Sequence, residues 1–274
     1  MPQVLVDASP VALTCWTFGF VVGLTLLALA IGFIAERVFR DYRVFAVSLA
    51  KHQLRFELIG NLVFIAVTTA ALTLVLQAKR VRFGEEGWIR GILTFFAILV
   101  GFQIYYWFLH RLMHTKALIQ IHAWHHRSHV TTPLSGQSMG FLEALGWMLG
   151  YAGLPLAFSL LVPISFWGWA GYLAFNILGN IVGHANVEMT AKMGVTRTTA
   201  LIGNPFVYHA LHHARWRGHY AFQAAFMDRV FGTEFADWPA LYARVSSGQP
   251  LKSLKERGDD AQAEAFGNRV HSSR

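Results

Sequence analysis

The sequence predicts an all-α integral membrane protein in which four to five hydrophobic helices form a bundle. Hydrophobic residues make up 54% of the 274 residues and charged residues only 14%, which is less polar surface than a soluble domain of this length needs. The nine Trp, eight Tyr and 22 Phe residues agree with this class, because aromatic side chains favour bilayer interfaces and packed helix faces. Five long apolar stretches supply the helices.

The first three stretches are long enough to cross a bilayer. Residues 12–35 carry no charge over 24 positions, which suits a tilted spanning helix. Residues 58–76 and 91–109 are 19 residues long each and are also free of charge. The sequence before residue 12 lacks the positive segment of a signal peptide, so we expect the first stretch to remain as a membrane span.

The last two stretches follow one another closely. Residues 144–162 stop at Pro163 and residues 164–183 restart at once, which predicts a tight helical hairpin. Pro155 and Pro163 leave open whether this pair crosses the membrane completely. From about His184 onward the chain is more polar, and we expect most of it to lie outside the hydrocarbon.

If each apolar stretch crosses the membrane once, the order of the stretches predicts which loops lie on the same side. Residues 36–57, 110–137 and 184–274 fall on one side, and residues 77–90 fall on the other. Lys and Arg number 5 and 3 in the first two segments, against 4 in 77–90, and short loops rich in these residues stay in the cytoplasm. We therefore expect the first side, which holds every dense histidine group, to face the cytoplasm.

Net charge and cysteine content reduce the number of function classes that this chain could belong to. Cytoplasmic loops and contacts with anionic lipid headgroups account for the net charge of +8. Nucleic acid is not an expected partner, because the basic residues are not interleaved with aromatic ones on a soluble module. The single cysteine, Cys15, excludes an internal disulfide and a cysteine-based zinc or iron–sulfur site.

Eight histidines stand in three boxes with helical spacing. "LHRLMHT" places two of them four residues apart at the mouth of the third span, and "HAWHH" and "HALHH" both repeat the spacing i, i+3, i+4. Residues three and four apart share a face of a helix, and paired imidazoles at this spacing are a common way to present metal ligands. The boxes therefore predict a helical metal site with the ligands His110, His114, His122, His125, His126, His209, His212 and His213.

The number of imidazoles predicts more than one metal ion. Tetrahedral zinc takes four protein ligands, so eight exceed what a single ion holds. Two ions roughly 3.5–4 Å apart, as in known two-metal sites, fit the count. The spacing does not choose between iron and zinc, because imidazole suits both.

His184 is predicted as a ninth ligand at the end of the fifth apolar stretch. Asn176, Asn180 and His184 recur every four residues and form a polar stripe on an otherwise apolar helix. For the two Asn residues, hydrogen bonds between helices and a role beside the site are both open. Asn180 is a candidate to orient a ligating ring.

Four more polar residues near the boxes are candidates for the site. Asn186 and Glu188 follow His184 closely enough to orient a ligating imidazole. His129 and His219 are weaker candidate ligands, because they stand near the boxes but outside the repeated spacing.

The boxes resemble those of the fatty acid hydroxylase/sterol desaturase superfamily of membrane di-iron oxidases. "HHRSHVTTPLSGQSMGFLEAL" resembles the segment after the family's second box, and "GHANVEM" resembles its isolated histidine between the second and third boxes. "GHYAFQAAFMDRVFGT" is similar to the segment after the third box. There, His219, Ala221 and Met227 replace the family's usual Asn, Gly and Trp, which leaves the ligands intact and the subfamily open.

The resemblance implies a cytosolic, histidine-rich helical cap over the membrane bundle. It implies an N-terminal membrane region over 1–90, a catalytic domain over 91–237 and a polar C-terminal tail over 238–274. It also implies two iron ions, with zinc as a possible substitute, O2 as co-substrate, and hydroxylation or desaturation of a fatty acyl, sterol or related lipid from the bilayer. Asp228, in the segment after the third box, is a further candidate to support the ligands.

The electrons for such a reaction must come from outside the chain, which has no dinucleotide-binding motif and no segment typical of a haem or flavin domain. A ferredoxin-like or cytochrome b5-like donor with its reductase is implied. Arg215 and Arg217 are candidate contacts for this donor, although contact with lipid headgroups is the favoured interpretation for both. We expect a multi-pass protein of a bacterial inner membrane, with the endoplasmic reticulum as the alternative.

Two other function classes compete with the oxidase. The main alternative is a membrane transporter or binding protein for zinc or iron without redox catalysis. Transport usually places ionisable residues at mid-membrane depth, whereas these histidines cluster at one face. A zinc hydrolase is less favoured, because the H-E-x-x-H signature is absent and no carboxylate stands inside a box.

Overall fold

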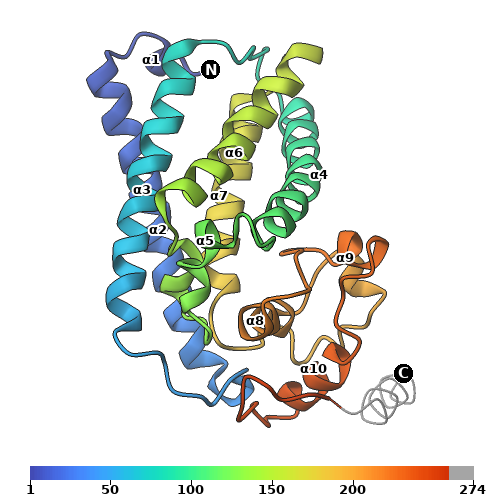
Figure 1. Ribbon diagram of the computed structural model, residues 1–274. Coiled ribbons are helices and arrows are strands. Elements are labelled where there is room, and N and C mark those ends of the chain that lie inside the picture. Colours follow the sequence, from blue (N-terminus) through green and yellow to red (C-terminus); the bar gives the residue numbers. More distant parts are fainter. Residues whose placement is uncertain (259–274) are drawn as a thin grey trace.

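A computed structural model describes residues 1–258, and the regular structure in this range is helical apart from three isolated β-bridges (Figure 1). The predicted all-α class is confirmed. Five long helices overlap the five apolar stretches: α2 (Pro10–Val38), α3 (Gln53–Ala78), α4 (Trp88–Met113), α6 (Phe141–Leu161) and α7 (Phe166–Gly183).

Local sequence signals set where these helices begin. α2 starts at Pro10, which has no N–H to satisfy, and the Ser9 hydroxyl accepts a hydrogen bond from the Ala12 N–H at 3.2 Å. At the start of α7 the Ser165 hydroxyl accepts from the Gly168 N–H in the same way, at 3.0 Å. α2, α3 and α4 extend a few residues beyond both ends of their apolar stretches.

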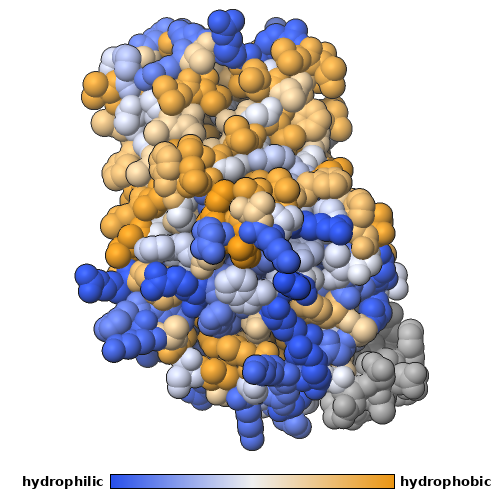
Figure 2. All heavy atoms as spheres, in the orientation of Figure 1, coloured by the Kyte–Doolittle hydropathy of each residue, from blue (hydrophilic) through white to orange (hydrophobic). Residues whose placement is uncertain are grey.

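The chain is a membrane protein by the length and composition of its helices. α2, α3, α4 and α6 are each long and apolar enough to cross a membrane. α7 is not among these four, and it carries the polar side chains of Asn176 and Asn180. Figure 2 shows hydrophobic residues over the sides of the bundle and hydrophilic residues concentrated at its two ends. A hydrophobic belt of this kind is what lipid requires of the surface it contacts.

The helices pack pairwise around a common core. α2 lies against α3 and α7, α4 lies against α6 and α7, and α3 lies against α6. The chain reverses between α6 and α7 as predicted, but each of the two packs mainly against other helices instead of forming a closely paired hairpin. Thr17 on α2 and Thr73 on α3 share a hydrogen bond of 2.6 Å between their buried hydroxyls, a bond typical of helix pairs in lipid.

One end of the bundle carries the cap. Figure 1 shows α8 (Phe206–Arg215), α9 (Phe226–Val230) and α10 (Trp238–Ser246) gathered below the long helices. The remaining short elements are α1 (Gln3–Val6), α5 (Ile119–His122) and the 3-10 helices η1 (Arg40–Tyr42), η2 (His125–Arg127), η3 (Pro133–Gln137) and η4 (Thr199–Leu201). Within the described chain, residues 36–57, 110–137 and 184–258, which the predicted spans put on one side, lie toward the end that carries the cap.

The cap has a hydrophobic core of its own. α10 packs against α8, and Trp238, Leu241 and Tyr242 are buried between the two helices and their neighbours. The described part of the predicted polar tail therefore contains a well-buried helix, while residues 259–274 of that tail lie outside the described residues.

The segment after the second box is inserted between long helices. The Glu57 carboxylate on α3 accepts hydrogen bonds from the hydroxyls of Ser128 and Thr132, each at 2.7 Å. Gly136 in η3 approaches the backbone of α7 so closely that a Cβ there would stand 2.8 Å from the Asn180 carbonyl oxygen. These contacts fix the loop that carries the second box against the bundle.

Candidate metal centre

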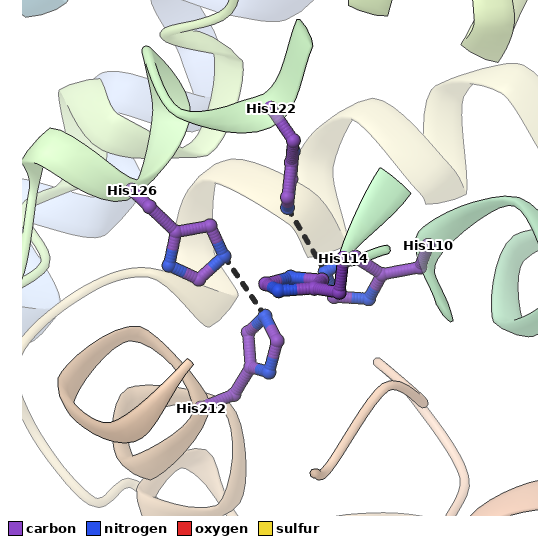
Figure 3. Close-up of side chains that lie close together, drawn as sticks. All are labelled: His110, His114, His122, His126 and His212. Atoms are coloured by element: carbon purple, nitrogen blue, oxygen red, sulfur yellow. Dashed lines mark hydrogen bonds between the residues drawn. The ribbon is translucent and has the colours of Figure 1, made fainter. Parts of the chain in front are cut away.

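The nine predicted ligands lie in two groups at the junction between the bundle and the cap. In each group the candidate donor atoms lie within 4.8 Å of one another. The five-histidine group, whose rings converge in Figure 3, consists of His110, His114, His122, His126 and His212. The four-histidine group consists of His125, His184, His209 and His213.

Helix ends deliver most of these side chains. His110 lies in the last turn of α4 and His114 is its C-cap, while His184 is the C-cap of α7. The third box is helical as predicted, since all three of its histidines lie on α8. The two long helices therefore present their ligands where they leave the bundle, and α8 presents its own from the cap.

The second box is not a single helix, so the prediction of one helical face over 122–126 is wrong. α5 ends at His122 and η2 begins at His125. His122 and His126 belong to the five-histidine group, whereas His125 belongs to the other. The third box divides in the same way, because His212 belongs to the first group and its two companions to the second.

The spacing of the ring nitrogens fits shared metal ions. Two ligands that each stand 2.0–2.1 Å from one ion are roughly 2.9–3.4 Å apart. Four pairs of Nε2 atoms match this range: 3.1 Å for His110–His122, 3.0 Å for His126–His212, 3.0 Å for His184–His209 and 3.2 Å for His209–His213.

Backbone carbonyls fix which nitrogen of each ring carries the proton. The Nδ1 atom of His110 lies 2.7 Å from the Tyr220 carbonyl oxygen, and that of His212 lies 2.7 Å from the Gly218 carbonyl oxygen. His125, His184 and His213 make the corresponding contacts with the carbonyls of Ser138, Asn180 and Ser128.

The chemistry of this donor set fits a bound cation. A carbonyl oxygen only accepts, so Nδ1 is protonated in these neutral rings and Nε2 offers a lone pair. For His110 and His122 both Nδ1 atoms face an oxygen, so the lone pairs of their Nε2 atoms face one another at 3.1 Å, and these repel unless a positive ion lies between them. The two groups could therefore hold metal ions, and they use the second ring nitrogen in the way that metal sites usually do.

Glu143 is a supporting residue that the sequence analysis missed. Its Oε1 atom lies 2.7 Å from Nδ1 of His122 and also accepts a hydrogen bond from the Trp147 indole N–H at 3.3 Å. Both carboxylate and imidazole are buried. A carboxylate behind a ligating histidine orients the ring and raises its basicity. The only signal in the sequence was an isolated carboxylate in the first turn of an apolar helix.

Burial keeps the imidazoles outside the spans neutral at neutral pH. Loss of solvation lowers the pKa of His125 to about 4 and that of His212 to about 3. For the other ligands outside the spans, loss of solvation is again the largest cause of a lowered pKa, and neighbouring imidazoles lower it further: His114, His122, His126, His184, His209 and His213. The neutral ring is the form that binds metal.

Of the predicted supporting residues near His184, one contacts a ligand directly. Asn180 does so through its backbone carbonyl, while its side-chain amide donates to the Gly136 carbonyl at 2.6 Å. The Asn186 side chain instead bonds the backbone of Phe45, so it contacts no ring of either group. Glu188 accepts from the Val207 N–H at 2.8 Å and thereby holds the start of α8.

Asp228 supports the site one step away from the ligands. Its buried carboxylate accepts hydrogen bonds from the backbone N–H groups of Tyr220 and Ala221 at 3.0 and 2.9 Å, and from the Trp107 indole at 2.9 Å. The Tyr220 carbonyl held in this way is the one that accepts from His110. Asp228 therefore positions the Tyr220 carbonyl, and this carbonyl in turn fixes the ring of His110.

The two weaker candidate ligands fall in neither group. His219 is buried with its ring stacked on Tyr208, and its Nδ1 atom lies 2.9 Å from the Tyr208 carbonyl oxygen. His129 is half-buried and accepts a hydrogen bond from the Trp216 indole at 3.4 Å. His219 thus packs the cap beneath α8, and His129 anchors the residue that covers the site.

Trp216 covers the five-histidine group on the side of the cap. Its ring centroid lies 4.6 Å from that of His126, and its edge faces His114 at 6.4 Å. The residue follows α8 directly and has a φ of +68°, a conformation that is strained for a bulky side chain. Backbone strain of this kind persists where the surrounding structure holds a functional side chain in place.

An apolar groove of about 560 Å³ leads to the four-histidine group. Its walls come from α4, α7 and the segments 201–206 and 222–226, and no charged side chain lines it within the described chain. Ile202 at the rim is 89% exposed, whereas His209 at the inner end is 3% exposed. The groove therefore connects the surface of the bundle with a candidate ligand.

A comparison with family sequence models gives one match. The model of the fatty acid hydroxylase family matches residues 95–233, which is just over half of the chain. This range contains all nine histidines of the two groups.

Several plant proteins are similar over the same part of the chain. The very-long-chain aldehyde decarbonylase CER1 of Arabidopsis thaliana is 30% identical over 161 residues, which cover 57% of this chain and 24% of that protein. Protein CER1-like 2 of the same plant is 32% identical over 142 residues, covering 51% of this chain and 23% of that protein. The very-long-chain aldehyde decarbonylase GL1-4 of Oryza sativa subsp. japonica is 30% identical over 148 residues, with 53% and 24% covered.

The matched region spans about a quarter of the length of these curated relatives. No solved structure matches the chain.

Proposed function

This chain belongs to the fatty acid hydroxylase family, and from that membership we propose that it is a membrane-bound di-iron enzyme that oxidises a long-chain aliphatic lipid with O2. One observation carries the proposal. Nine imidazoles, all but one of them buried, form two neighbouring groups, and in one group the Nε2 atoms of His110 and His122 face one another 3.1 Å apart while both Nδ1 atoms face an oxygen. A purely structural role would pair these two Nε2 atoms with hydrogen-bond donors instead.

Each group would hold one iron ion, with zinc as a possible substitute, since imidazole suits both metals. When bound, the two ions would supply the site for O2 and for its reduction. Hydroxylation places one oxygen atom of O2 into a C–H bond and releases the other as water, which consumes two electrons and two protons. Desaturation with the same electrons and protons removes two hydrogens and releases two waters.

The chain's own residues prepare the site for this chemistry. Backbone carbonyls hold the Nδ1 protons, so the rings need no rearrangement when metal binds. Glu143 orients His122 from behind. Trp216 and the core of the cap separate the histidines from bulk water, which protects reactive species from side reactions.

The groove supports a lipid substrate. Leu99, Val100 and Phe175 form its outer wall on α4 and α7, helices that run through the hydrophobic belt. An aliphatic chain can therefore enter from the bilayer without crossing water. We propose that fatty acyl chains and related lipids are the substrate class.

The names of the plant relatives favour a second candidate reaction. CER1 and GL1-4 are named as very-long-chain aldehyde decarbonylases. The same groove would admit a long aldehyde, whose carbonyl carbon would leave as carbon monoxide while the aldehyde hydrogen stays on the hydrocarbon, which is one carbon shorter. Hydroxylation and desaturation leave the carbon count unchanged, so the products separate the three reactions.

An external electron donor of the ferredoxin or cytochrome b5 type, with its reductase, completes the proposed system. Of the two arginines considered for docking, Arg215 forms a two-pronged ion pair with Asp237 at 2.7 and 2.8 Å and its side chain is 5% exposed. Arg217 is exposed and stands beside Trp216 in the chain. We propose Arg217 and its surroundings as the donor contact.

We further propose that the cap faces the cytoplasm, in a bacterial inner membrane or in the endoplasmic reticulum. The short loops on the cap side contain more Lys and Arg than the loop on the other side, and this supports the orientation. Reporter fusions after Arg90 and after His129 should report opposite sides of the membrane.

The main experiment combines metal analysis with lipid analysis. Purified protein should carry about two irons per chain, and cells that make the protein should accumulate a lipid with one more oxygen, two fewer hydrogens or one fewer carbon. A double variant with His125→Ala and His213→Ala should insert into the membrane and leave the lipids unchanged. One zinc per chain, or a wild-type lipid profile identical to that of the variant, would overturn the proposal.

A further inference from the structure

The groove is separated from a second, much smaller cavity by one side chain. This inner compartment measures about 20 Å³ and is bordered by His122, His125 and Glu143. Among the described residues, Phe222 alone lines both the groove and the inner compartment. Its ring therefore stands between the groove, which reaches His209, and the histidines that border the inner compartment.

The two spaces suit different occupants. A cavity needs roughly 10–15 Å³ to hold one water, so the inner compartment accommodates one water-sized molecule and no aliphatic chain. Its wall is partly polar, since the buried Tyr151 hydroxyl donates to the Asn176 side chain there. The groove, in contrast, has the volume of a small-molecule site and mostly apolar walls.

Phe222 is held firmly at this boundary. Its ring lies face to face with His184, with centroids 5.6 Å apart, and meets His209 edge-on at 4.7 Å. Gly183 permits this position, because a Cβ at residue 183 would stand 2.6 Å from Cζ of the ring. The Phe222 carbonyl accepts a hydrogen bond from the Asn204 side chain at 3.2 Å, so the backbone is anchored as well.

We propose that Phe222 is the stop of the lipid groove and thereby a specificity-determining residue. Its ring blocks further entry of an aliphatic chain once the end of that chain lies beside His209. The chain therefore stays out of the inner compartment. The position of the stop fixes which carbon of the substrate lies beside the four-histidine group. This inference rests on the proposed function for the nature of the chain, while the stop itself follows from the geometry of the two cavities.

The experiment measures how far a chain penetrates, without any turnover. The full chain in lipid nanodiscs is photolabelled with hexadecane that carries a diazirine at one end, and the labelled residues are mapped by mass spectrometry. Wild-type protein should be labelled at the inner end of the groove, near Pro205, and not at Met139 or Tyr151, which line only the inner compartment. Phe222→Ala joins the two spaces, so labelling of Met139 and Tyr151 should rise several-fold.

Two further variants make the result decisive. Phe96→Ala is the matched control, because Phe96 is 55% exposed on α4 and lines neither cavity, and its labelling should equal that of wild type. Phe222→Leu, a smaller change than Phe222→Ala, should give intermediate labelling of the compartment. Retained binding of two Co2+ ions per chain, read by absorbance, establishes that each variant is folded.

Labelling of the inner compartment in wild-type protein would contradict the proposal that Phe222 is the stop of the groove. Labelling that stays at the wild-type level in both folded Phe222 variants would contradict it as well. These outcomes are independent of catalysis. A chain that is labelled as expected but alters no lipid in cells would overturn the proposed function and leave the stop in place.

Discussion

His125 and His126 are adjacent in the chain, yet their imidazoles serve different groups, with ring planes at 90° and centroids 5.8 Å apart. Both residues lie in η2, where successive side chains point in different directions. His212 and His213 are adjacent and divided between the groups in the same way, and such pairs allow each candidate metal position to be tested alone.

Removing His125 should weaken one metal position and spare the other. The four-histidine group has no fifth imidazole to compensate, so His125→Ala should lower the bound metal from about two ions per chain toward one. Titration with Co2+ followed by absorbance measures the number. His129→Ala, which alters a histidine outside both groups, should still bind both ions. Full loading of His125→Ala would exclude this residue from the site.

Glu143→Gln should reduce metal affinity without removing a ligand. The neutral amide cannot provide the charge that supports His122, and its NH2 group can turn toward Nδ1 and favour the wrong tautomer. Loss of such a supporting partner typically costs about 10–100-fold in affinity. Competition with a chelator measures the change, and Glu85→Gln, at an exposed position far from the site, is the control. Equal affinities would mean that Glu143 only fills space.

The metal-free protein should lose stability in acid through its buried histidines. The folded-state pKa values of His125 and His212 lie at about 4 and 3, below the value of about 6.5 for an unfolded histidine. The unfolded state therefore binds more protons, and the stabilisation present above about pH 6.5 is lost as the pH falls toward the folded values.

Thermal unfolding of chelator-treated protein in detergent tests this dependence between about pH 7.5 and pH 5. The melting temperature should fall steadily over this range, and it should fall less steeply for His125→Ala. A flat wild-type curve would show that these imidazoles are not buried in the neutral form.

Asp228→Ala should destabilise the cap strongly. It would leave buried donors from Tyr220, Ala221 and Trp107 without an acceptor, at a cost of about 3 kcal/mol or more in the free energy of unfolding. Asp41→Ala, where the carboxylate is 82% exposed, should change it by about 0.5 kcal/mol or less. Chemical denaturation in detergent compares the two variants, and similar effects would contradict the positioning role.

Trp216→Gly should relieve the backbone strain at residue 216 and at the same time remove the side chain that covers the five-histidine group. Glycine adopts a positive φ without the penalty of roughly 1–2 kcal/mol that other residues incur, so relief of strain should offset part of the lost packing on His126. The bound metal should nevertheless exchange faster with a chelator, because the cover is gone. Trp216→Phe, which keeps a ring, should exchange at close to the wild-type rate. Equal rates for both variants would contradict the covering role.

The sequence predicted the long helices, and it singled out nine histidines that the fold brings together. Both depend on side-chain type: long runs without charge identify helices in lipid, and eight histidines at repeated spacing, with His184 as a ninth, identify candidate donor nitrogens. The i, i+3, i+4 spacing of the second box nevertheless predicted a continuous helix, whereas the structure breaks between His122 and His125; α8 divides its own three histidines between the two groups without a break.

The supporting contacts were harder to predict because most of them use the backbone. The carbonyls of Tyr220, Gly218 and Ser128 hold ligating rings, and every residue has such a carbonyl, so its side chain carries no signal. Asn186 had a suitable side chain and a suitable position in the sequence, but its amide serves Phe45 instead. Only the packing of distant segments decides such pairings.

Helix α8 contributes to both groups, with His212 in one and His209 and His213 in the other. A chain emerging from the ribosome consequently lacks at least one ligand of each centre until residue 213 has been made and α8 has docked beneath α4 and α7. Nascent chains can thus enter the membrane before either group of histidines is complete.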